Sequence, residues 1–192
     1  MTTAKRRKAR LIAVDGVDVQ TMLAVARRSL GTAGQGGISH WDASGVFQEL
    51  AVAGAAAGLP SPRTLLLLYA ADLAFRLRWE IRPALAEGNT VVAAPYIETA
   101  VAFGRAAGIP AGWLANLFRF APHPGQLVVV DTPPKRLKRH IDGFVGFSCK
   151  QIGGRPAGRT PREILDATAH ELHRVSKKVK SQKSKVKSTS DF

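Results

Sequence analysis

The first polar groups with a spacing that could support chemistry follow a short apolar run: Asp15, Gly16, Asp18 and Thr21. Residues 11–14 are apolar with a β-branched bias and predict a buried strand, and an apolar-periodic run that predicts a helix begins at Val19. In nucleotide-binding α/β proteins this strand–turn–helix junction carries the phosphate loop G-x-x-x-x-G-K-[ST], whose N–H groups, Lys and hydroxyl hold phosphate and Mg²⁺. The junction therefore stands where a phosphate site would be.

The groups that such a loop needs are absent from this junction. No glycine lies between Gly16 and Gly31, and no lysine lies between Lys8 and Lys135. Thr21 offers a hydroxyl for a metal, but it also fits an ordinary helix start. ATP and Mg²⁺ are therefore expected as cofactors only if another arrangement replaces the loop.

The positive charge of the chain is concentrated near its two ends. The 192 residues carry a net charge of +14, of which residues 1–10 contribute +5 and residues 174–192 contribute +6. The 16 basic and 13 acidic residues of the segment 11–173 leave only +3 there. Basic tails bind nucleic acid or another acidic partner, or stay solvated as disordered chain, and both alternatives remain open.

The cysteine count and the distribution of apolar residues exclude several classes of site and of protein. A single cysteine, Cys149, excludes an internal disulfide and a cysteine-based zinc site, and His170 and His173 lack a third ligand, so no metal site is expected. The longest apolar run, residues 65–71, is too short to span a bilayer. Because only four apolar residues follow the basic arm, no secretory signal is predicted, and we expect a cytoplasmic protein without a membrane span.

Strands and helices alternate along the chain. The expected strands are residues 11–14, 38–41, 90–94, 127–130 and 144–150, and the expected helices are residues 19–30, 45–57, 63–87, 97–107, 110–120, 135–141 and 161–175. This order predicts an α/β fold of three layers, a mostly parallel sheet with helices on both faces. We expect a basic arm at residues 1–10, one domain at 11–175 and a disordered Lys/Ser-rich tail at 176–192.

Ligands of parallel sheets bind outside the carboxyl ends of the strands, and the long helix adds an Asp and an Arg at i,i+4 spacing. These rules give a set of candidate nucleotide-binding residues: Asp15, Gly16, Asp18, Thr21, Trp41, Asp42, Asp72, Arg76, Tyr96 and Thr99. Trp41 and Asp42 fit either a pocket lining or ordinary packing of a turn. No residue is predicted to be catalytic.

Four segments, in the same order, make residues 11–135 resemble the thymidylate kinase family. Residues 66–72 and 81–85 are similar to its L-L-x-F-A-A-D-R and I-x-P-A-L segments. Residues 14–18 resemble the start of its E-G-x-D-G-x-G-K-S-T loop, and residues 91–99 its strand ending in D-R-Y-x-x-S. Residues 113–134 resemble its W-L-x-x-L-x-x-F helix with the strand and Pro-Pro that follow.

The resemblance implies a P-loop kinase-like fold, dTMP as acceptor and a homodimer, but the motifs depart from the family where catalysis takes place. Tyr69 would be the aromatic residue that stacks on thymine, whereas Leu73 stands where the family has an arginine that contacts the base. The Asp-Arg pair before Tyr96 is Ala-Pro, and Thr99 takes the serine position. The segment after Pro134 is too short for a full lid.

Three functions follow. The first is a thymidylate kinase-like protein that has lost ATP-dependent phosphoryl transfer and acts as a nucleotide-binding or regulatory module. The second is an active nucleotide kinase, converting dTMP and ATP to dTDP and ADP, with a non-standard phosphate site. The third is a nucleic-acid-associated protein that binds through its basic tails.

Overall fold

The computed structural model describes residues 9–33, 35–132, 137 and 142–189. Four parallel strands form its sheet in the order β2-β3-β1-β4. They are β1 (Arg10–Asp15), β2 (Gly36–His40), β3 (Thr90–Ala94) and β4 (Gln126–Val129). In the centre of the sheet, Ala13 pairs with Ala93 of β3 and with Leu127 of β4. The predicted parallel sheet is therefore confirmed.

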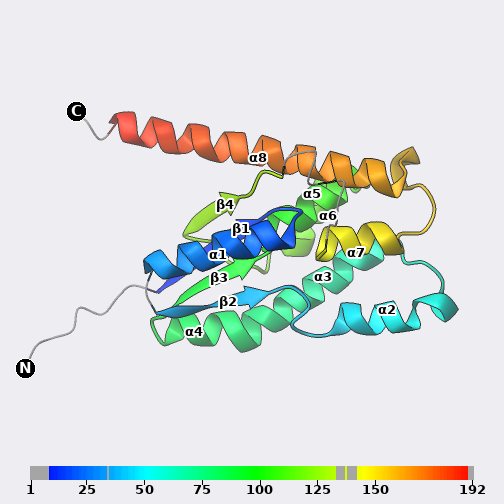
Figure 1. Ribbon diagram of the computed structural model, residues 1–192, viewed down its shortest axis with the longest axis horizontal. Helices are drawn as coiled ribbons and strands as arrows, with labels where there is room; N and C mark the ends of the chain where they lie inside the picture. The colour runs from blue at the N-terminus through cyan, green and yellow to red at the C-terminus, as the bar shows by residue number, and fades with distance from the viewer. Residues whose placement is uncertain (1–8, 34, 133–136, 138–141, 190–192) are drawn as a thin grey trace, which may run out of the picture.

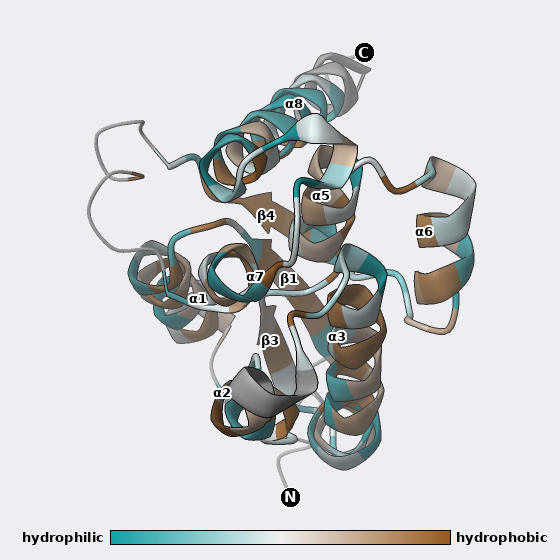
Figure 2. Ribbon diagram, turned by 90° about the vertical axis from the view of Figure 1, so that its right-hand side faces the viewer, coloured by the Kyte–Doolittle hydropathy of each residue, from teal (hydrophilic) through white to brown (hydrophobic). Residues whose placement is uncertain are grey.

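Helices cover both faces of this sheet (Figures 1 and 2). On one face, Ile12 and Val14 of β1 pack with Met22 and Ala26 of α1 (Val19–Ala33). On the other face, Leu11 and Ala13 join a larger core with three helices: α3 (Pro62–Arg76), α5 (Glu98–Ala106) and α7 (Phe144–Gln151). Because successive side chains of a strand point to opposite faces, one apolar strand serves both cores. The predicted three-layer α/β fold is confirmed.

The long helical stretch predicted at residues 63–87 contains a change of helix type. α3 begins after Ser61, whose hydroxyl accepts a hydrogen bond from Thr64 N at 3.1 Å. A π-helical turn, η1 (Leu77–Ile81), then joins α3 to α4 (Arg82–Ala86). Pro83 has no N–H to donate, so the ladder cannot continue unbroken; Arg82 N–H reaches Leu77 O, five residues back. The π-helical turn thus ends two residues before Pro83.

The strand predicted at residues 144–150 is wrong, because this segment is α7. Phe144 and Phe147 both contact Trp41 and Phe47, which requires side chains three residues apart to share a face, as in a helix. The sequence of this segment alternates as in a strand, but its two phenylalanines have the spacing of a helix. The predicted helix at 135–141 lies outside the described residues apart from residue 137.

The last helix also differs from its prediction. α8 (Pro161–Thr189) continues in place of the disordered tail expected from residue 176. Ser176 is buried, Val179 lines a small hollow with residues of β4, and Lys180 Nζ lies 3.7 Å from Asp131 Oδ2. These contacts with the sheet edge hold the helix beyond the point where composition alone predicted an end. Other helices are α2 (Val46–Ala57) and α6 (Ala111–Phe118).

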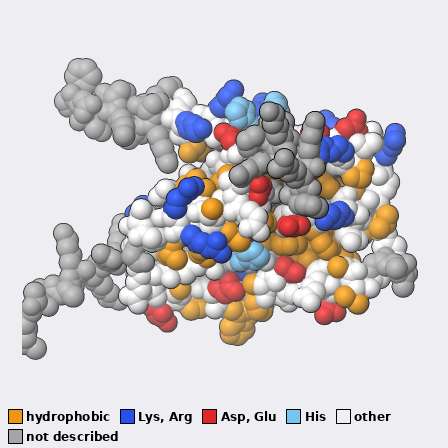
Figure 3. Space-filling model, in the orientation of Figure 1, with side chains coloured by type: hydrophobic (Ala, Val, Ile, Leu, Met, Phe, Trp, Pro, Cys, Tyr) orange, Lys and Arg blue, Asp and Glu red, His pale blue; other side chains and the backbone are white. Residues whose placement is uncertain are grey.

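Two surface properties bear on function. Within the described part of the chain, no helix is both long enough and apolar enough to span a membrane. On the face shown in Figure 3, basic and acidic side chains are interspersed and do not form one continuous basic band.

Candidate functional site

The connection between β1 and α1 consists of three residues, Gly16, Val17 and Asp18. Val17 is buried in the core, with an exposed fraction of 2%. Asp18 caps the helix: its Oδ1 accepts from Thr21 N at 3.2 Å, and its Oδ2 accepts from the Thr21 hydroxyl at 3.0 Å. A carboxylate of the chain therefore takes the place at the helix N-terminus where a phosphate would bind.

Asp15, at the carboxyl end of β1, joins this strand to the start of α5. Its Oδ1 accepts hydrogen bonds from Tyr96 N (2.9 Å), Thr99 N (3.0 Å) and the Thr99 hydroxyl (2.7 Å). Thr99 Oγ1 in turn accepts from Gly16 N at 3.1 Å. Asp15 is fully buried, and this burial raises the pKa of its carboxyl group although the hydrogen bonds oppose the shift. Its other oxygen, Oδ2, has no hydrogen-bond partner among the described residues.

Arg76 and Asp72 form a second buried group at the carboxyl ends of β2 and β3. Arg76 Nη1 lies 3.8 Å from Asp72 Oδ2, and both side chains are fully buried. Arg76 donates through Nε to Ser39 Oγ (2.9 Å) and through Nη2 to Ser39 O (3.0 Å) and Pro95 O (2.9 Å). The guanidinium thus ties α3 to the ends of two strands.

Asp72 completes this group by holding the turn that follows β2. Its Oδ1 accepts from Ser44 N (3.0 Å) and Ser44 Oγ (2.9 Å), and its Oδ2 accepts from Asp42 N (3.2 Å). Asp42, at a positive φ of 62°, accepts from Phe47 N (2.9 Å) and Gln48 N (3.1 Å) at the start of α2. These carboxylates are therefore engaged in shaping the loop.

Aromatic side chains fill the space beside Tyr69. The Tyr69 ring is fully buried, and its centroid lies 4.5 Å from that of Phe144 and 6.1 Å from that of Phe118. The Tyr69 hydroxyl donates to Tyr96 O, and burial raises the pKa of Tyr69. Trp41 packs on Phe47, with centroids 5.0 Å apart, in the same cluster. No face of the Tyr69 ring is open to solvent.

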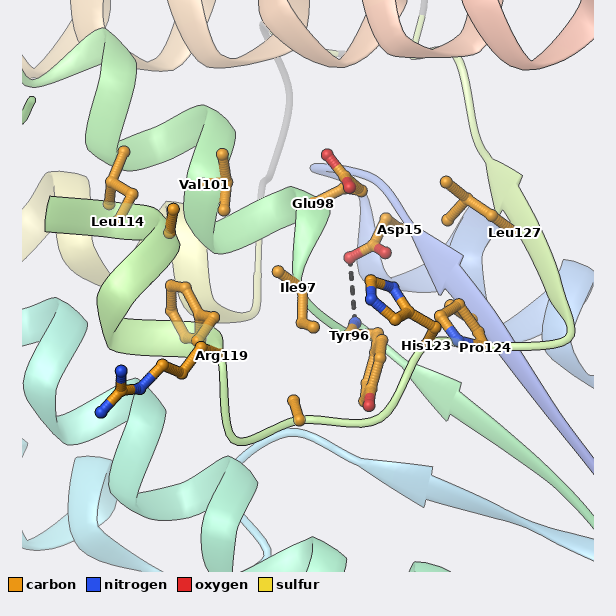
Figure 4. Close-up of a pocket in the computed structure, with 14 residues that line it drawn as sticks. Asp15, Tyr96, Ile97, Glu98, Val101, Leu114, Arg119, His123, Pro124 and Leu127 are labelled. Atoms are coloured by element: carbon orange, nitrogen blue, oxygen red, sulfur yellow. Dashed lines mark hydrogen bonds between the residues drawn. The ribbon is translucent and has the colours of Figure 1, made fainter. Parts of the chain in front are cut away.

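A cavity of about 560 Å³ lies beside Asp15, between α5, α6 and β4 (Figure 4). Its polar lining comes from Asp15, Tyr96, Glu98, Arg119 and His123. Burial, and the nearby Asp15 carboxylate, raise the pKa of Glu98. Burial raises the pKa of Tyr96 to about 12, and its hydroxyl donates to Pro122 O at 2.7 Å.

Comparison with known proteins gives a consistent relationship. The chain is 39% identical over 77 residues to a probable thymidylate kinase of Thermococcus gammatolerans, covering 40% of this chain and 37% of that protein. It is 33% identical over 128 residues to a thymidylate kinase of Xanthomonas oryzae pv. oryzae, covering 65% and 56%. The crystal structure of thymidylate kinase from Ehrlichia chaffeensis superposes with a TM-score of 0.63 at 12% identity, covering 88% of this chain and 87% of that one.

The chain is thus similar in sequence to thymidylate kinases over part of its length. It spans between about one third and a little over half of the length of the curated relatives it matches. No family model matches the sequence. At 12% identity the structural match supports the fold alone.

The structure places the eleven predicted site residues of this chain in four groups. These groups are Asp15, Gly16, Tyr96 and Thr99; Asp42, Asp72 and Arg76; Asp18 and Thr21; and Trp41 and Tyr69. No group of three or more metal-ligating side chains was found within the described ranges.

Sequence reasoning missed three contributors. Ser39 accepts from Arg76, but it lies inside a predicted strand with nothing to distinguish it. Phe144 covers Tyr69, but its segment was assigned to a strand. Glu98 lies two residues after Tyr96 in the family's D-R-Y-x-x-S segment, and this position was the one available signal.

Proposed function

We propose that this chain is a member of the thymidylate kinase family that does not transfer phosphoryl groups from ATP through a phosphate loop, and that it acts as a nucleotide-binding or regulatory module. The observation that carries the proposal is the three-residue connection between β1 and α1. A connection of this length is too short to surround a phosphate with N–H groups. Asp18 already engages Thr21, the nearest hydroxyl to the place where the family holds its metal.

Electrostatics supports the same proposal. Catalysis of phosphoryl transfer consists mainly of positioning and of neutralising the charge that develops on the phosphoryl group. Loss of a single preorganised donor costs roughly 3 kcal/mol of barrier. The loop lysine is absent, Leu73 replaces an arginine of the family, and Arg76 is engaged by Ser39 and Pro95 in the interior.

Packing on the acceptor side supports the loss of phosphoryl transfer to dTMP. If dTMP bound as the family resemblance implies, its base would stack on Tyr69. Phe144 occupies one side of that ring and Phe118 another. A deoxynucleotide would therefore need α7 to move, or would bind elsewhere on the chain.

A second candidate function is that of an active thymidylate kinase with a non-standard phosphate site. The similar proteins reported above favour it, because each of them is named a thymidylate kinase or a probable thymidylate kinase. Thr21, together with Asp15, would then be the nearest groups to the transferred phosphate.

One experiment separates the two candidates. The purified chain is incubated with Mg²⁺, ATP and dTMP, formation of dTDP is followed, and binding of ATP–Mg²⁺, dTMP and dTDP is measured separately by calorimetry. We expect no dTDP above the blank and no stabilisation by ATP. Formation of dTDP that is lost in Thr21→Ala and kept in Thr32→Ala, an exposed threonine of α1, would overturn the proposal and establish the kinase.

The nucleic-acid alternative remains a prediction about the terminal segments. Residues 1–8 lie outside the described residues, and α8 carries exposed lysines at 177, 178 and 180. Likewise, the homodimer implied by the family resemblance remains a prediction.

A further inference from the structure

The cavity between α5, α6 and β4 lies largely apart from the groups that the family motifs identify. Of the eleven predicted site residues, Asp15 and Tyr96 alone line it. Its volume of about 560 Å³ falls within the range of small-molecule sites, roughly 300–1,000 Å³. Figure 4 shows Val101 and Leu114 on the helices and Leu127 on β4 around it. The cavity therefore has the size and the apolar walls of a ligand site.

Asp15, one of the residues that line this cavity, carries a hydrogen-bonding atom without a partner among the described residues. Its side chain is fully buried, and its Oδ1 accepts from three donors, whereas Oδ2 has no partner among the described residues. Buried polar atoms are almost always hydrogen-bonded, because an unpaired one retains its full cost of desolvation. A ligand with a hydrogen-bond donor would remove that cost.

A second carboxyl group, that of Glu98, favours a positively charged ligand in the cavity. Glu98 is half-buried and lines the same cavity, and burial together with the Asp15 carboxylate raises its pKa. A positive group between them would relieve both the repulsion and the desolvation. The basic lining residues, Arg119 and His123, are exposed, so solvent screens their charge more than it screens the buried pair.

We propose that this cavity binds a small organic cation: an apolar or aromatic body carrying a protonated nitrogen whose N–H donates to Asp15 Oδ2. Phe118, Leu114 and Leu127 supply the apolar walls, and Glu98 adds a second negative charge. The proposed site shares Asp15 with the β1–α1 junction, but its other walls come from α5, α6, β4 and the segments that join them.

Three compounds of nearly the same shape test the charge and the donor. Benzamidine is a planar cation with N–H donors, benzamide is its neutral counterpart, and benzoate is its anionic counterpart. Each is titrated into the full chain and followed by calorimetry and amide chemical shifts. We expect saturable binding of benzamidine, weaker binding of benzamide and no binding of benzoate. Binding of benzoate equal to or tighter than that of benzamidine, or no binding of benzamidine at millimolar concentration, would overturn the proposal.

Variants then locate the site. Asp15→Asn is expected to weaken benzamidine by at least about tenfold, and Glu98→Gln by about fivefold, because each removes a negative charge from the lining. Ala115, an exposed small residue of α6, lines the cavity, so Ala115→Phe is expected to block it. Ala111→Phe places the same ring on an exposed position of the same helix outside the lining and is expected to leave binding unchanged.

The variants also protect the test against a folding failure. Three hydrogen bonds converge on the Asp15 carboxylate, so Asp15→Asn can prevent folding. In that case the comparison of Ala115→Phe with Ala111→Phe tests the location of the site. Equal affinity of benzamidine for Ala115→Phe and for the unchanged chain would refute the location. Loss of affinity in Ala115→Phe alone supports it.

Discussion

Two buried carboxylates stand at the same edge of the sheet, and their surroundings differ. Asp72 uses both oxygens, accepting from Ser44 and Asp42 and facing Arg76. Asp15 uses one oxygen for three donors and leaves the other without a partner beside a cavity. Both oxygens of Asp72 are therefore engaged within the fold, whereas Asp15 Oδ2 can still accept a hydrogen bond from a ligand.

The same contrast holds for the space around them. Trp41, Phe47, Tyr69 and Phe144 form one aromatic cluster on the Asp72 side of the sheet edge. The Asp15 side opens into the cavity under α5 and α6 (Figure 4). A residue at a position typical of a binding site therefore indicates ligand binding only if the fold leaves one of its hydrogen-bonding atoms without a partner.

The largest effect is expected when the closed group is broken. Arg76→Met is expected to lower the free energy of unfolding by about 3–5 kcal/mol, because it leaves Asp72 buried without its counter-charge. Urea denaturation measures this loss. Arg78→Met, which replaces an exposed arginine two residues away, is expected to change stability by less than about 0.5 kcal/mol. Similar losses in the two variants would refute the view of Arg76 as a structural residue.

A smaller effect is expected when the aromatic filling is trimmed. Phe144→Leu is expected to cost about 1–2 kcal/mol of unfolding free energy, since part of a fully packed ring is lost beside Tyr69. The variant also sharpens the contrast between the two regions, because it creates space where thymine would stack. We expect dTMP to bind the variant more tightly than the unchanged chain in calorimetry. Tight binding of dTMP to the unchanged chain would show that Phe144 is no obstacle.

Much of this fold could be predicted from the sequence, because the sheet strands are short apolar runs with clear boundaries. Residues 90–94 were predicted at their observed positions, and the Asp72–Arg76 pair was predicted from its i,i+4 spacing. The pair is wholly buried, however, which the spacing alone cannot show.

The secondary-structure predictions are wrong in segments whose conformation depends on tertiary contacts. Phe144 and Phe147 follow the spacing of a helix only once Trp41 and Phe47 are known to face them. The helix beyond residue 175 depends on Ser176 and Val179 packing at the sheet edge. The cavity joins residues more than 100 positions apart, from Asp15 to His123, and no local pattern records such a meeting.

The last prediction concerns pH and the unpartnered carboxylate. Burial raises the pKa of Asp15 in the folded chain above its ordinary value of 3.8, so the folded state holds this proton more tightly than the unfolded state. The contribution of Asp15 is therefore most favourable at low pH and declines as the pH rises above about 4 towards the raised value. The comparison is made through the difference in unfolding free energy between Asp15→Asn and the unchanged chain.

Asparagine cannot ionise, so this difference should shift in favour of the variant as the pH rises from 4 to 7. Urea denaturation at several pH values measures it, and Asp166→Asn, at an exposed position of α8, serves as the control with a flatter response. Saturating benzamidine should reduce the shift for Asp15, because a bound cation compensates the buried charge. A shift in the opposite direction would mean that Asp15 is stabilised as an anion by the fold itself, and the contrast with Asp72 would then disappear.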